Sequence, residues 1–342
     1  MSALSLLRQM LSGRDESVSP QRRRPSDARH AAQGARVATL KNAMSASQWA
    51  LLFVLSVLWG CSFLFTEMAI RELPILTIVA LRVLIAGMVL LCLSHSIGYR
   101  MPIERSVMRA FLCMGLMNNV LPFCLFVWGQ THIASGLAAI LNSTTPFAAI
   151  ALAHYFTRDE KATSVRVIGV IIGFAGIVVA IGAGAFEGLG TQVLAQLACV
   201  AGALSYAYAG VYARCFEGMG TKPLTAATGQ VTASAIVLVP LAVIFDRPWE
   251  LPAPSSLTWV AILGSAILST ALGYILYFRI LSTAGATNLL LVTFLVPISA
   301  ITLGSVFLGE KLQSHHYFGV AIVAVGLAVI DGRFIRHFRT QK

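Results

Sequence analysis

The charged and polar residues that could do chemistry in this chain stand inside long apolar stretches, where each needs a partner. Arg82 is the only fixed charge far from the end of such a stretch, eight residues past Pro74. At a rise of about 1.5 Å per residue it would lie about 12 Å inside the hydrocarbon. Its guanidinium could hold a substrate carboxylate, because its planar fork fits planar anions. Alternatively, it could donate to carbonyls of a neighbouring helix and serve only the structure.

A second group of candidates consists of small polar and aromatic side chains at helical spacing. Asn142 and Thr145 share one face with Ser135, Ala138 and Ala139, and such a stripe either lets two helices approach or lines a cavity. Aromatic members could stack on a planar solute, or simply pack or anchor the chain at the membrane interface. The candidates for lining a cavity, besides Arg82, are Trp59, Asn118, Asn119, Asn142, Thr145, Tyr208, Ser269, Thr270, Tyr274 and Thr293.

Two prolines stand at matching places in apolar stretches that resemble each other. Pro146 removes the helical donor for the carbonyl of Asn142, and Pro297 does the same for Thr293. Helices broken at corresponding positions in two halves are typical of transporter binding sites. A plain kink in each helix is the alternative.

Three acids could carry a proton or take part in gating. Glu67 lies near the end of an apolar stretch and could bind a proton, but Arg71 follows four residues later, the spacing of an ordinary surface pair. Glu160 and Glu310 each precede a glycine-rich apolar helix, where an acid can cap the first turn or form a gating salt bridge. Cysteine and histidine show no metal-ligand spacing, so we expect no metal, no cofactor and no catalytic residue.

Composition places all these residues in a lipid bilayer. Hydrophobic residues make up 57% of the chain and charged residues 11%, whereas about a quarter of a soluble domain is charged. Several apolar runs exceed the roughly 20 residues that cross a membrane. Ten spans are predicted, at about 48–69, 74–95, 107–129, 133–156, 166–184, 190–212, 222–245, 257–280, 284–308 and 315–334.

The chain is also written twice. Residues 136–181 and 285–330 both run from a glycine through an apolar helix with Pro146 or Pro297, a Glu-Lys pair at 160/161 or 310/311, and a glycine-rich helix. Five spans per unit make the second unit cross the membrane in the opposite sense. The predicted fold is therefore all-α and integral to the membrane, with two inverted five-helix repeats at 48–184 and 190–334.

Lysine and arginine set the orientation. They concentrate in alternate loops, which the positive-inside rule places in the cytoplasm, while the opposite loops carry only Arg71, Arg247 and Lys311. Residues 1–47 are polar and basic and are predicted to be a disordered cytoplasmic tail, unless Met44 is the true start; residues 335–342 form a second basic tail inside. The net charge of +11 is thus explained by insertion, and a nucleic-acid partner is not expected.

Several short motifs resemble the EamA family of the drug/metabolite transporter superfamily. They are Leu58-Trp59-Gly60-Cys61-Ser62-Phe63, Ala80-Leu81-Arg82, Gly136-Leu137-Ala138-Ala139 with Pro146, Glu160 before Gly169, and Glu310 before Gly319. The resemblance covers residues 48–334 and implies a ten-helix carrier of small metabolites, often an exporter of amino acids, in the bacterial inner membrane. The second half departs from the family pattern because it has no counterpart of Arg82.

These observations favour a secondary transporter that exports a small metabolite, such as an amino acid, by alternating access. Its expected partners are a small-molecule solute and the bilayer, and a homodimer is compatible with the sequence. The alternative is a membrane-embedded enzyme acting on a lipid or peptide. That function needs catalytic groups converging within a span, and the sequence offers none.

Overall fold

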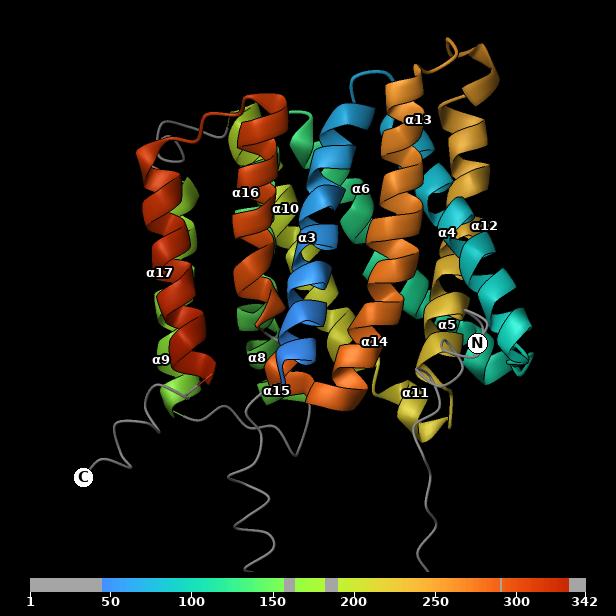
Figure 1. The fold of residues 1–342 in the computed structure, drawn as a ribbon, viewed down its shortest axis with the longest axis horizontal. Coiled ribbons are helices and arrows are strands. Elements are labelled where there is room, and N and C mark those ends of the chain that lie inside the picture. The colour runs from blue at the N-terminus through green and yellow to red at the C-terminus, as the bar shows by residue number, and fades with distance from the viewer. Residues whose placement is uncertain (1–44, 157–163, 182–189, 290, 332–342) are drawn as a thin grey trace, which may run out of the picture.

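The structure is a computed structural model that describes residues 45–156, 164–181, 190–289 and 291–331. Within this part of the chain every regular element is a helix (Figure 1). The first half contains α3 (Ala46–Ala69), α4 (Ile75–Ile97), α5 (Arg105–Gly115), η1 (Leu116–Val120), α6 (Leu121–Gln130), α7 (Ser135–Asn142), α8 (Thr145–Phe156) and α9 (Ser164–Ile181). The second half contains α10 (Thr191–Tyr212), α11 (Cys215–Gly218), α12 (Pro223–Phe245), η3 (Pro248–Glu250), α13 (Ser256–Leu263), η4 (Gly264–Leu272), α14 (Gly273–Ala284), α15 (Ala286–Leu289), α16 (Val292–Leu308) and α17 (Ser314–Asp331).

Seven helical stretches in the described residues are long and apolar enough to cross a membrane. Three further apolar helices are shorter, at Val167–Ile181, Leu295–Leu308 and Ser314–Ile330. The all-helical membrane character expected from composition is confirmed. The count of ten crossings stays a prediction, because these three apolar stretches are shorter than the roughly 20 residues that cross a bilayer.

Helix ends follow from local sequence. Ser45 begins α3 with a capping box, in which its hydroxyl accepts from the Gln48 amide and the Gln48 side chain accepts from the Ser45 N–H. Gly98 ends α4 in the left-handed region at φ 84°, which glycine adopts without steric cost. Pro74 and Ala134 precede α4 and α7 and have no side-chain oxygen for capping, so neither helix has a cap from its own segment.

The predicted helix break at Pro146 is present as a gap between α7 and α8. α7 ends at Asn142, and Pro146 stands in the first turn of α8, where its missing N–H is not needed. Pro297 lies inside α16, which is a continuous helix from Val292 to Leu308. The break expected at Pro146 is therefore present, whereas the break expected at Pro297 is not.

Two helices widen into π-helical segments that the sequence did not predict. η1 separates α5 from α6, and η4 separates α13 from α14. A π segment bonds each amide five residues back, so it inserts an extra residue into a turn and redirects the side chains beside it. Both segments contain polar candidates: Asn118 and Asn119 in η1, and Ser269 and Thr270 in η4.

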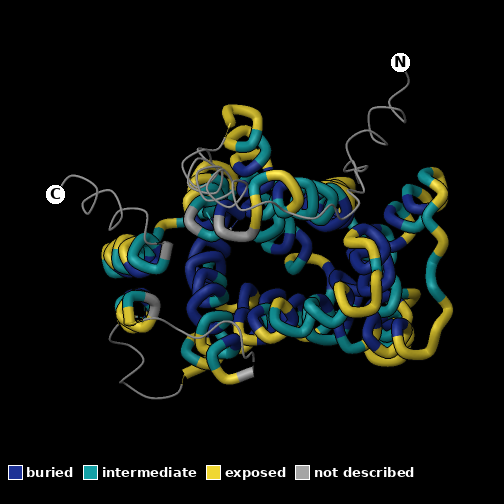
Figure 2. Tube along the Cα trace, turned by 90° about the horizontal axis from the view of Figure 1, so that it is seen from below, coloured by how far each residue is buried: buried dark blue, intermediate teal, exposed yellow. Residues whose placement is uncertain are grey.

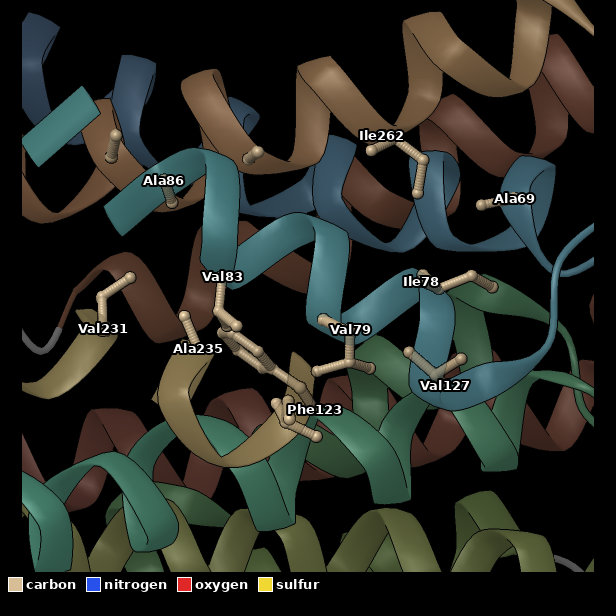
Figure 3. Close-up of a cluster of buried hydrophobic side chains, with 14 of the residues drawn as sticks. Ala69, Ile78, Val79, Val83, Ala86, Phe123, Val127, Val231, Ala235 and Ile262 are labelled. Carbon is tan, nitrogen blue, oxygen red and sulfur yellow. The ribbon is translucent and has the colours of Figure 1, made fainter. Parts of the chain in front are cut away.

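The largest buried cluster joins α4, α6, α12 and the α13–η4 helix. Figure 3 shows Val79 and Val83 of α4 beside Phe123 of α6, with Val231 and Ala235 of α12 completing the layer. Seen from below, buried positions gather where helices face one another (Figure 2). This packing surrounds the position of Arg82 on α4.

α9 and α17 pack closely at one side of the molecule (Figure 1). Their glycines allow the contact: a Cβ on Gly169 would lie 2.8 Å from the Gly326 carbonyl oxygen, and one on Gly176 would lie 2.9 Å from that of Gly319. Real Cβ atoms do not approach backbone this closely, so the two helices could not pack as they do with larger residues.

A matched pair of substitutions tests this packing. In Gly176→Ala the new methyl meets the Val323 nitrogen at 2.7 Å, whereas Gly210 of α10 has no atom within 4 Å of a built Cβ. We expect Gly176→Ala to lower stability by about 1–3 kcal/mol through overpacking. Gly210→Ala should be neutral or stabilising by up to about 1 kcal/mol through helix propensity.

The measurement is the melting temperature of each purified variant in detergent. Equal melting temperatures for the two variants would show that α9 and α17 do not depend on glycine for their contact.

Candidate functional site

Arg82 lies buried among residues from both halves of the chain. Its side chain is 8% exposed. The Nε–H donates to Thr270 Oγ1 at 2.9 Å, and the guanidinium carbon lies 4.0 Å from the centre of the Phe123 ring. The cation thus rests on an aromatic face, a favourable contact when desolvated. Only one of the five N–H groups of the Arg82 guanidinium therefore donates to Thr270.

The rest of the guanidinium has no hydrogen-bond acceptor and no acid partner among the described residues. Its one hydrogen bond to the protein is that to Thr270. Within the described ranges the one ion pair closer than 4.0 Å joins Arg247 to Glu250, and both side chains are exposed. A buried cation without an anion is costly in an apolar medium. The arrangement therefore suits an anionic group placed against Arg82.

Amides and hydroxyls form a connected network beside Arg82. The Tyr274 hydroxyl donates to Asn119 Oδ1 at 2.9 Å, and Asn118 Nδ2 donates to the Tyr274 oxygen at 2.9 Å and to Gln230 Oε1 at 3.0 Å. Asn119 Nδ2 donates in turn to Ser234 Oγ at 3.0 Å. Tyr274 also lies near Arg82. The network joins α14 and η1 to α12, so it fixes the walls around the guanidinium.

The π segments place these side chains. In η4 the Thr270 hydroxyl donates to the Ser265 carbonyl five residues back at 2.9 Å, and Ser269 Oγ donates across to the Leu58 carbonyl of α3 at 2.6 Å. With these bonds Thr270 presents its oxygen to Arg82 while Ser269 anchors the segment to α3. Neither π segment could be anticipated, because residue spacing carries no signal for the extra residue in a turn.

Of the remaining aromatic candidates, Tyr208 is not brought to the cluster. It is 39% exposed and stacks on Tyr212, with ring centres 6.3 Å apart. Tyr206 takes the inner position: its ring centre lies 6.5 Å from that of Phe123 and 6.0 Å from that of Phe126, and its side chain lies near Arg82. One residue in the sequence indicates that this face of α10 packs inward. Gly202 lies one turn before Tyr206, and its lack of a side chain leaves room for the Phe126 ring.

Trp59 packs in a neighbouring apolar cluster. Its ring centre lies 5.9 Å from that of Tyr277, and its Nε1 lies 2.8 Å from a Cβ built on Gly273. The absence of a side chain at Gly273 therefore makes room for the indole. These contacts are the packing role that the sequence left open for Trp59.

The interruption between α7 and α8 forms a separate polar group. The Thr145 hydroxyl donates to the Asn142 carbonyl at 2.8 Å and so replaces the amide that Pro146 lacks. Ser143 Oγ reaches the Thr293 carbonyl of α16 at 3.5 Å. Asn142 Oδ1 is buried and has no partner within the described residues. No hydrogen bond among those residues connects this group to Arg82, so the predicted cavity set divides in two.

Three carboxylates cap the starts of helices, and each caps a helix in the half of the chain to which it does not itself belong. Asp246 Oδ2 accepts from the Thr77 amide at 2.7 Å and from its hydroxyl at 2.9 Å, in the first turn of α4. Glu72 accepts from the Ser255 amide and hydroxyl, both at 2.7 Å, at the start of α13. Acids at helix N-termini are favoured by the unpaired amides and the helix dipole.

The third contact involves Glu310. Its two oxygens accept from the amides of Ser135 and Gly136 at 2.9 and 3.2 Å. Glu310 thus caps α7, not the helix that follows it, and it supplies the cap that Ala134 cannot. We call the Asp246, Glu72 and Glu310 contacts together the carboxylate latch. It closes the face carrying Arg71, Arg247 and Lys311, which is the predicted external face.

Glu67 lies near Glu310 at the same face, and Glu160 lies outside the described residues. The Glu67 carboxylate interacts electrostatically with Glu310 and more weakly with Arg71, and the Gln130 side chain makes a hydrogen bond to it. Glu67 and Arg71 do not approach to ion-pair distance, so the surface pair expected from their spacing is not formed. Instead Glu67 Oε2 is buried without a partner among the described residues. The described residues include no group of three His, Cys, Asp or Glu that could hold a metal ion.

A groove of about 280 Å³ lies away from Arg82, between α4, α12 and the 246–255 connection. Its lining is almost wholly apolar, with Thr77 and Trp259 as the residues that carry polar atoms on their side chains. Such a surface offers no groups to orient a polar solute, so we do not assign the site there.

The comparisons with known proteins agree with this arrangement. The EamA-like transporter family matches the chain twice, at residues 47–182 and 193–331. The chain belongs to the EamA-like transporter family. The resemblance seen in the short motifs is therefore confirmed, and the protein is a membrane transporter by family.

Its relatives are themselves described as uncharacterized transporters. The inner membrane transporter YedA of Escherichia coli (strain K12) is 24% identical over 288 residues, 83% of this chain and 90% of that one. YvbV of Bacillus subtilis (strain 168) is 24% identical over 285 residues, 82% of this chain and 90% of the relative. A solved structure titled "Crystal structure of protein" has the same fold, with a TM-score of 0.60 at 20% identity over 84% of this chain and 98% of that chain.

The carboxylate latch predicts a pH dependence through Glu72. The Ser255 amide and hydroxyl, which donate to its carboxylate, lower the pKa of Glu72 below its ordinary value of 4.5. A lowered folded-state pKa stabilises the fold above the ordinary value, and this stabilisation is lost as pH falls through the folded-state pKa. At pH 7 the wild type should therefore melt above Glu72→Gln, and the gap should close below pH 4.5 as the carboxylate takes a proton.

Melting temperatures across this range in detergent provide the measurement. Glu104→Gln, at an exposed acid whose side chain makes no cap bond at the start of α5, is the matched control and should show no such closing gap. A constant gap between wild type and Glu72→Gln at all pH values would contradict the ionic cap.

Proposed function

We propose that this EamA-like protein is a secondary transporter that exports a small metabolite with a carboxylate group, such as an amino acid, by alternating access. The observation that carries the proposal is Arg82: it is 8% exposed, lies on the Phe123 ring, and has a single hydrogen bond to the described residues. A carboxylate placed against its free N–H groups would neutralise the charge and complete the hydrogen bonds. The neighbouring Asn118, Tyr274 and Gln230 offer polar atoms for the rest of such a solute.

Two units related by a twofold axis in the membrane plane can open alternately to either side, and the α9–α17 contact supports such an axis. Glu160 aligns with Glu310, so equivalent positions in the glycine-rich helices that follow differ by 150. Gly169 is then equivalent to Gly319, and Gly176 to Gly326. In the structure Gly169 packs on Gly326, and Gly176 packs on Gly319. Such reciprocal contacts between antiparallel helices are those that a twofold axis produces.

Other contacts between the helices show the same reciprocal pattern between equivalent elements of the two halves. α3 packs on α16 and α14, while its equivalent α10 packs on α8 and α6, which are the equivalents of those two helices. The π segments also correspond, because residues 116–120 shifted by 150 fall at 266–270, inside η4. Both halves thus supply a widened segment near Arg82: η1 through its two asparagines, and η4 through Thr270.

The carboxylate latch provides the second requirement, a closure that can open. Each of its contacts joins the two halves, with partners 169 to 183 residues apart in sequence. Release of a solute at the predicted external face requires the two halves to separate there, and these bonds would break together. The latch consists of exposed and partly buried hydrogen bonds between loops and helix ends, not of an apolar core, so it can open without unfolding a helix.

The membrane-enzyme alternative gains no support from these contacts. Near Arg82 the described polar groups are amides and hydroxyls that satisfy one another, and none is arranged as a nucleophile with an adjacent base. The relatives are named as transporters. We therefore retain transport as the single proposal.

The test is counterflow in proteoliposomes. Vesicles containing the purified protein are loaded with one unlabelled amino acid at a time, and uptake of the same labelled amino acid is measured. Saturable uptake that is accelerated by the internal solute supports a carrier, whereas movement that never saturates would contradict one.

Arg82 gives the sharper prediction. In Arg82→Gln the KM for the transported carboxylate should rise about ten- to hundredfold, because charge-assisted hydrogen bonds contribute about 1.5–3 kcal/mol. Arg82→Lys keeps the charge but loses the planar, two-pronged hydrogen-bonding geometry of the guanidinium, so its KM should lie between those of the wild type and Arg82→Gln. Arg100→Gln, at an exposed residue after α4, is the matched control.

Folded yield by size-exclusion chromatography separates binding from structure. If Arg82→Gln folds and transports with an unchanged KM, the guanidinium does not bind the solute.

The inverted arrangement has its own test. Lys161 and Lys311 follow Glu160 and Glu310, so they should lie on opposite sides of the membrane. Each is changed to Cys in a chain whose six native cysteines are replaced, and whole cells are treated with a membrane-impermeant maleimide. Only Lys311→Cys should react from outside. Reaction of both cysteines from the same side would show that the two repeats are not inverted, and it would contradict alternating access based on that inversion.

A further inference from the structure

The strongest remaining feature is a buried polar group at the predicted external face that the solute site does not use. It contains Glu67 at the end of α3, Gln130 at the end of α6, Ser135 at the start of α7, and Glu310 after α16. Two of its oxygens, Glu67 Oε2 and Ser135 Oγ, are buried with no hydrogen-bond partner among the described residues. Buried polar atoms normally have partners, so these two need an explanation.

The oxygens of Glu310 and Ser135 converge on one small space. A Cβ built on Gly304 would lie 2.6 Å from Glu310 Oε2 and 2.9 Å from Ser135 Oγ. Ser135 is fully buried, at 0% exposure. The glycine therefore keeps open a space that the carboxylate and the unpartnered hydroxyl both face.

Glu310 is already occupied as an acceptor by the Ser135 and Gly136 amides. Glu67 differs, because no donor reaches its Oε2 and its strongest charged neighbour is another acid. The charged groups that interact with the Glu67 carboxylate are Glu310 and, more weakly, the exposed Arg71, and the Gln130 side chain makes a hydrogen bond to the carboxylate group. Gln130 Nε2 donates to the Phe63 carbonyl at 2.8 Å, so its amide is held in place by α3.

Two carboxyl groups that repel each other in a partly buried place, with only a weakly interacting arginine beside them, do not both ionise readily, so one of them tends to bind a proton. The proton fits Glu67 Oε2, the oxygen without a donor. Protonated Glu67 gains an O–H that can donate, and both of its neighbours, the Glu310 carboxylate and the Gln130 amide oxygen, can accept. A single proton thus replaces a repulsion between two anions by a hydrogen bond.

We infer that Glu67, together with Glu310 and Ser135, forms a proton-binding site that couples solute transport to proton movement. The coupling rests on the proposed function, whereas the binding site does not. Glu67 belongs to the first half of the chain and Glu310 to the second, and Glu310 is also part of the carboxylate latch. Binding of the proton therefore favours the closed latch, and its loss restores the repulsion between the halves and favours opening. No bond other than O–H forms or breaks.

Infrared titration of the purified protein in liposomes tests the site without a solute. The wild type should show the C=O band of a protonated carboxyl at neutral pH. Glu67→Gln should remove this band, and Glu104→Gln, at an exposed acid near the start of α5, should retain it. Glu67→Asp keeps a carboxyl one methylene further back and should shift the midpoint of the titration. A wild type without the band, or a band that survives in Glu67→Gln, overturns the inference even if other variants fail to fold.

Transport tests the coupling. Vesicles containing a trapped pH dye receive the amino acid identified by counterflow, and an imposed pH gradient drives its accumulation. Glu67→Gln should retain counterflow exchange, which needs no net proton movement, and lose accumulation driven by the gradient. A wild type that exchanges the solute but accumulates none of it under the gradient overturns the coupling while the transporter stands. If the wild type moves no solute, the proposed function fails, and the infrared titration alone decides the proton site.

Discussion

A polar group surrounded by hydrocarbon has no water to bind, and this constraint explains most of the specific contacts in the structure. Where Pro146 removes a helical donor, the Thr145 hydroxyl supplies one to the Asn142 carbonyl. Where Pro74 and Ala134 cannot cap α4 and α7, acids from the other half of the chain do so. The same rule makes the exceptions informative, because a group without a partner in such a protein marks a place where something else binds.

Among the described residues with unmet polar atoms, Arg82 and Glu67 are the ionisable ones, and they are of opposite charge and at different depths. Arg82 has free donors in the packed interior, held between Phe123 and Thr270. Glu67 has a free acceptor at the predicted external face, beside a second acid. An anionic solute at the first and a proton at the second would each satisfy the unmet group. The carboxylate latch lies at the same face as Glu67, so closing one end of the molecule and binding a proton share Glu310.

The comparison of sequence with structure shows which features are local. Helix positions agreed within a few residues, because apolar runs, Pro74, Gly98 and the Ser45 cap act within a turn or two. Predictions of which residues on a helix face the protein interior and which face the lipid agreed less well with the structure. Tyr208 and Tyr206 stand two residues apart on one apolar helix, and in lipid an apolar residue can face either the bilayer or the protein, so hydrophobicity does not separate them. The surface pair of Glu67 with Arg71 failed for a related reason: spacing along α3 ignores Gln130 and Glu310, which pack against it.

The sequence by itself determined the solvent, the helices, the doubling of the chain and the family, since all four follow from composition and from residues near one another. It also placed Arg82 within a span and singled out Glu67 and Glu310. Only the tertiary structure decided what these residues meet: Thr270, 188 residues from Arg82, and Ser135, 175 residues from Glu310. The physical reason is that capping and charge compensation here act between helices of different halves, and no local pattern encodes which ends come together.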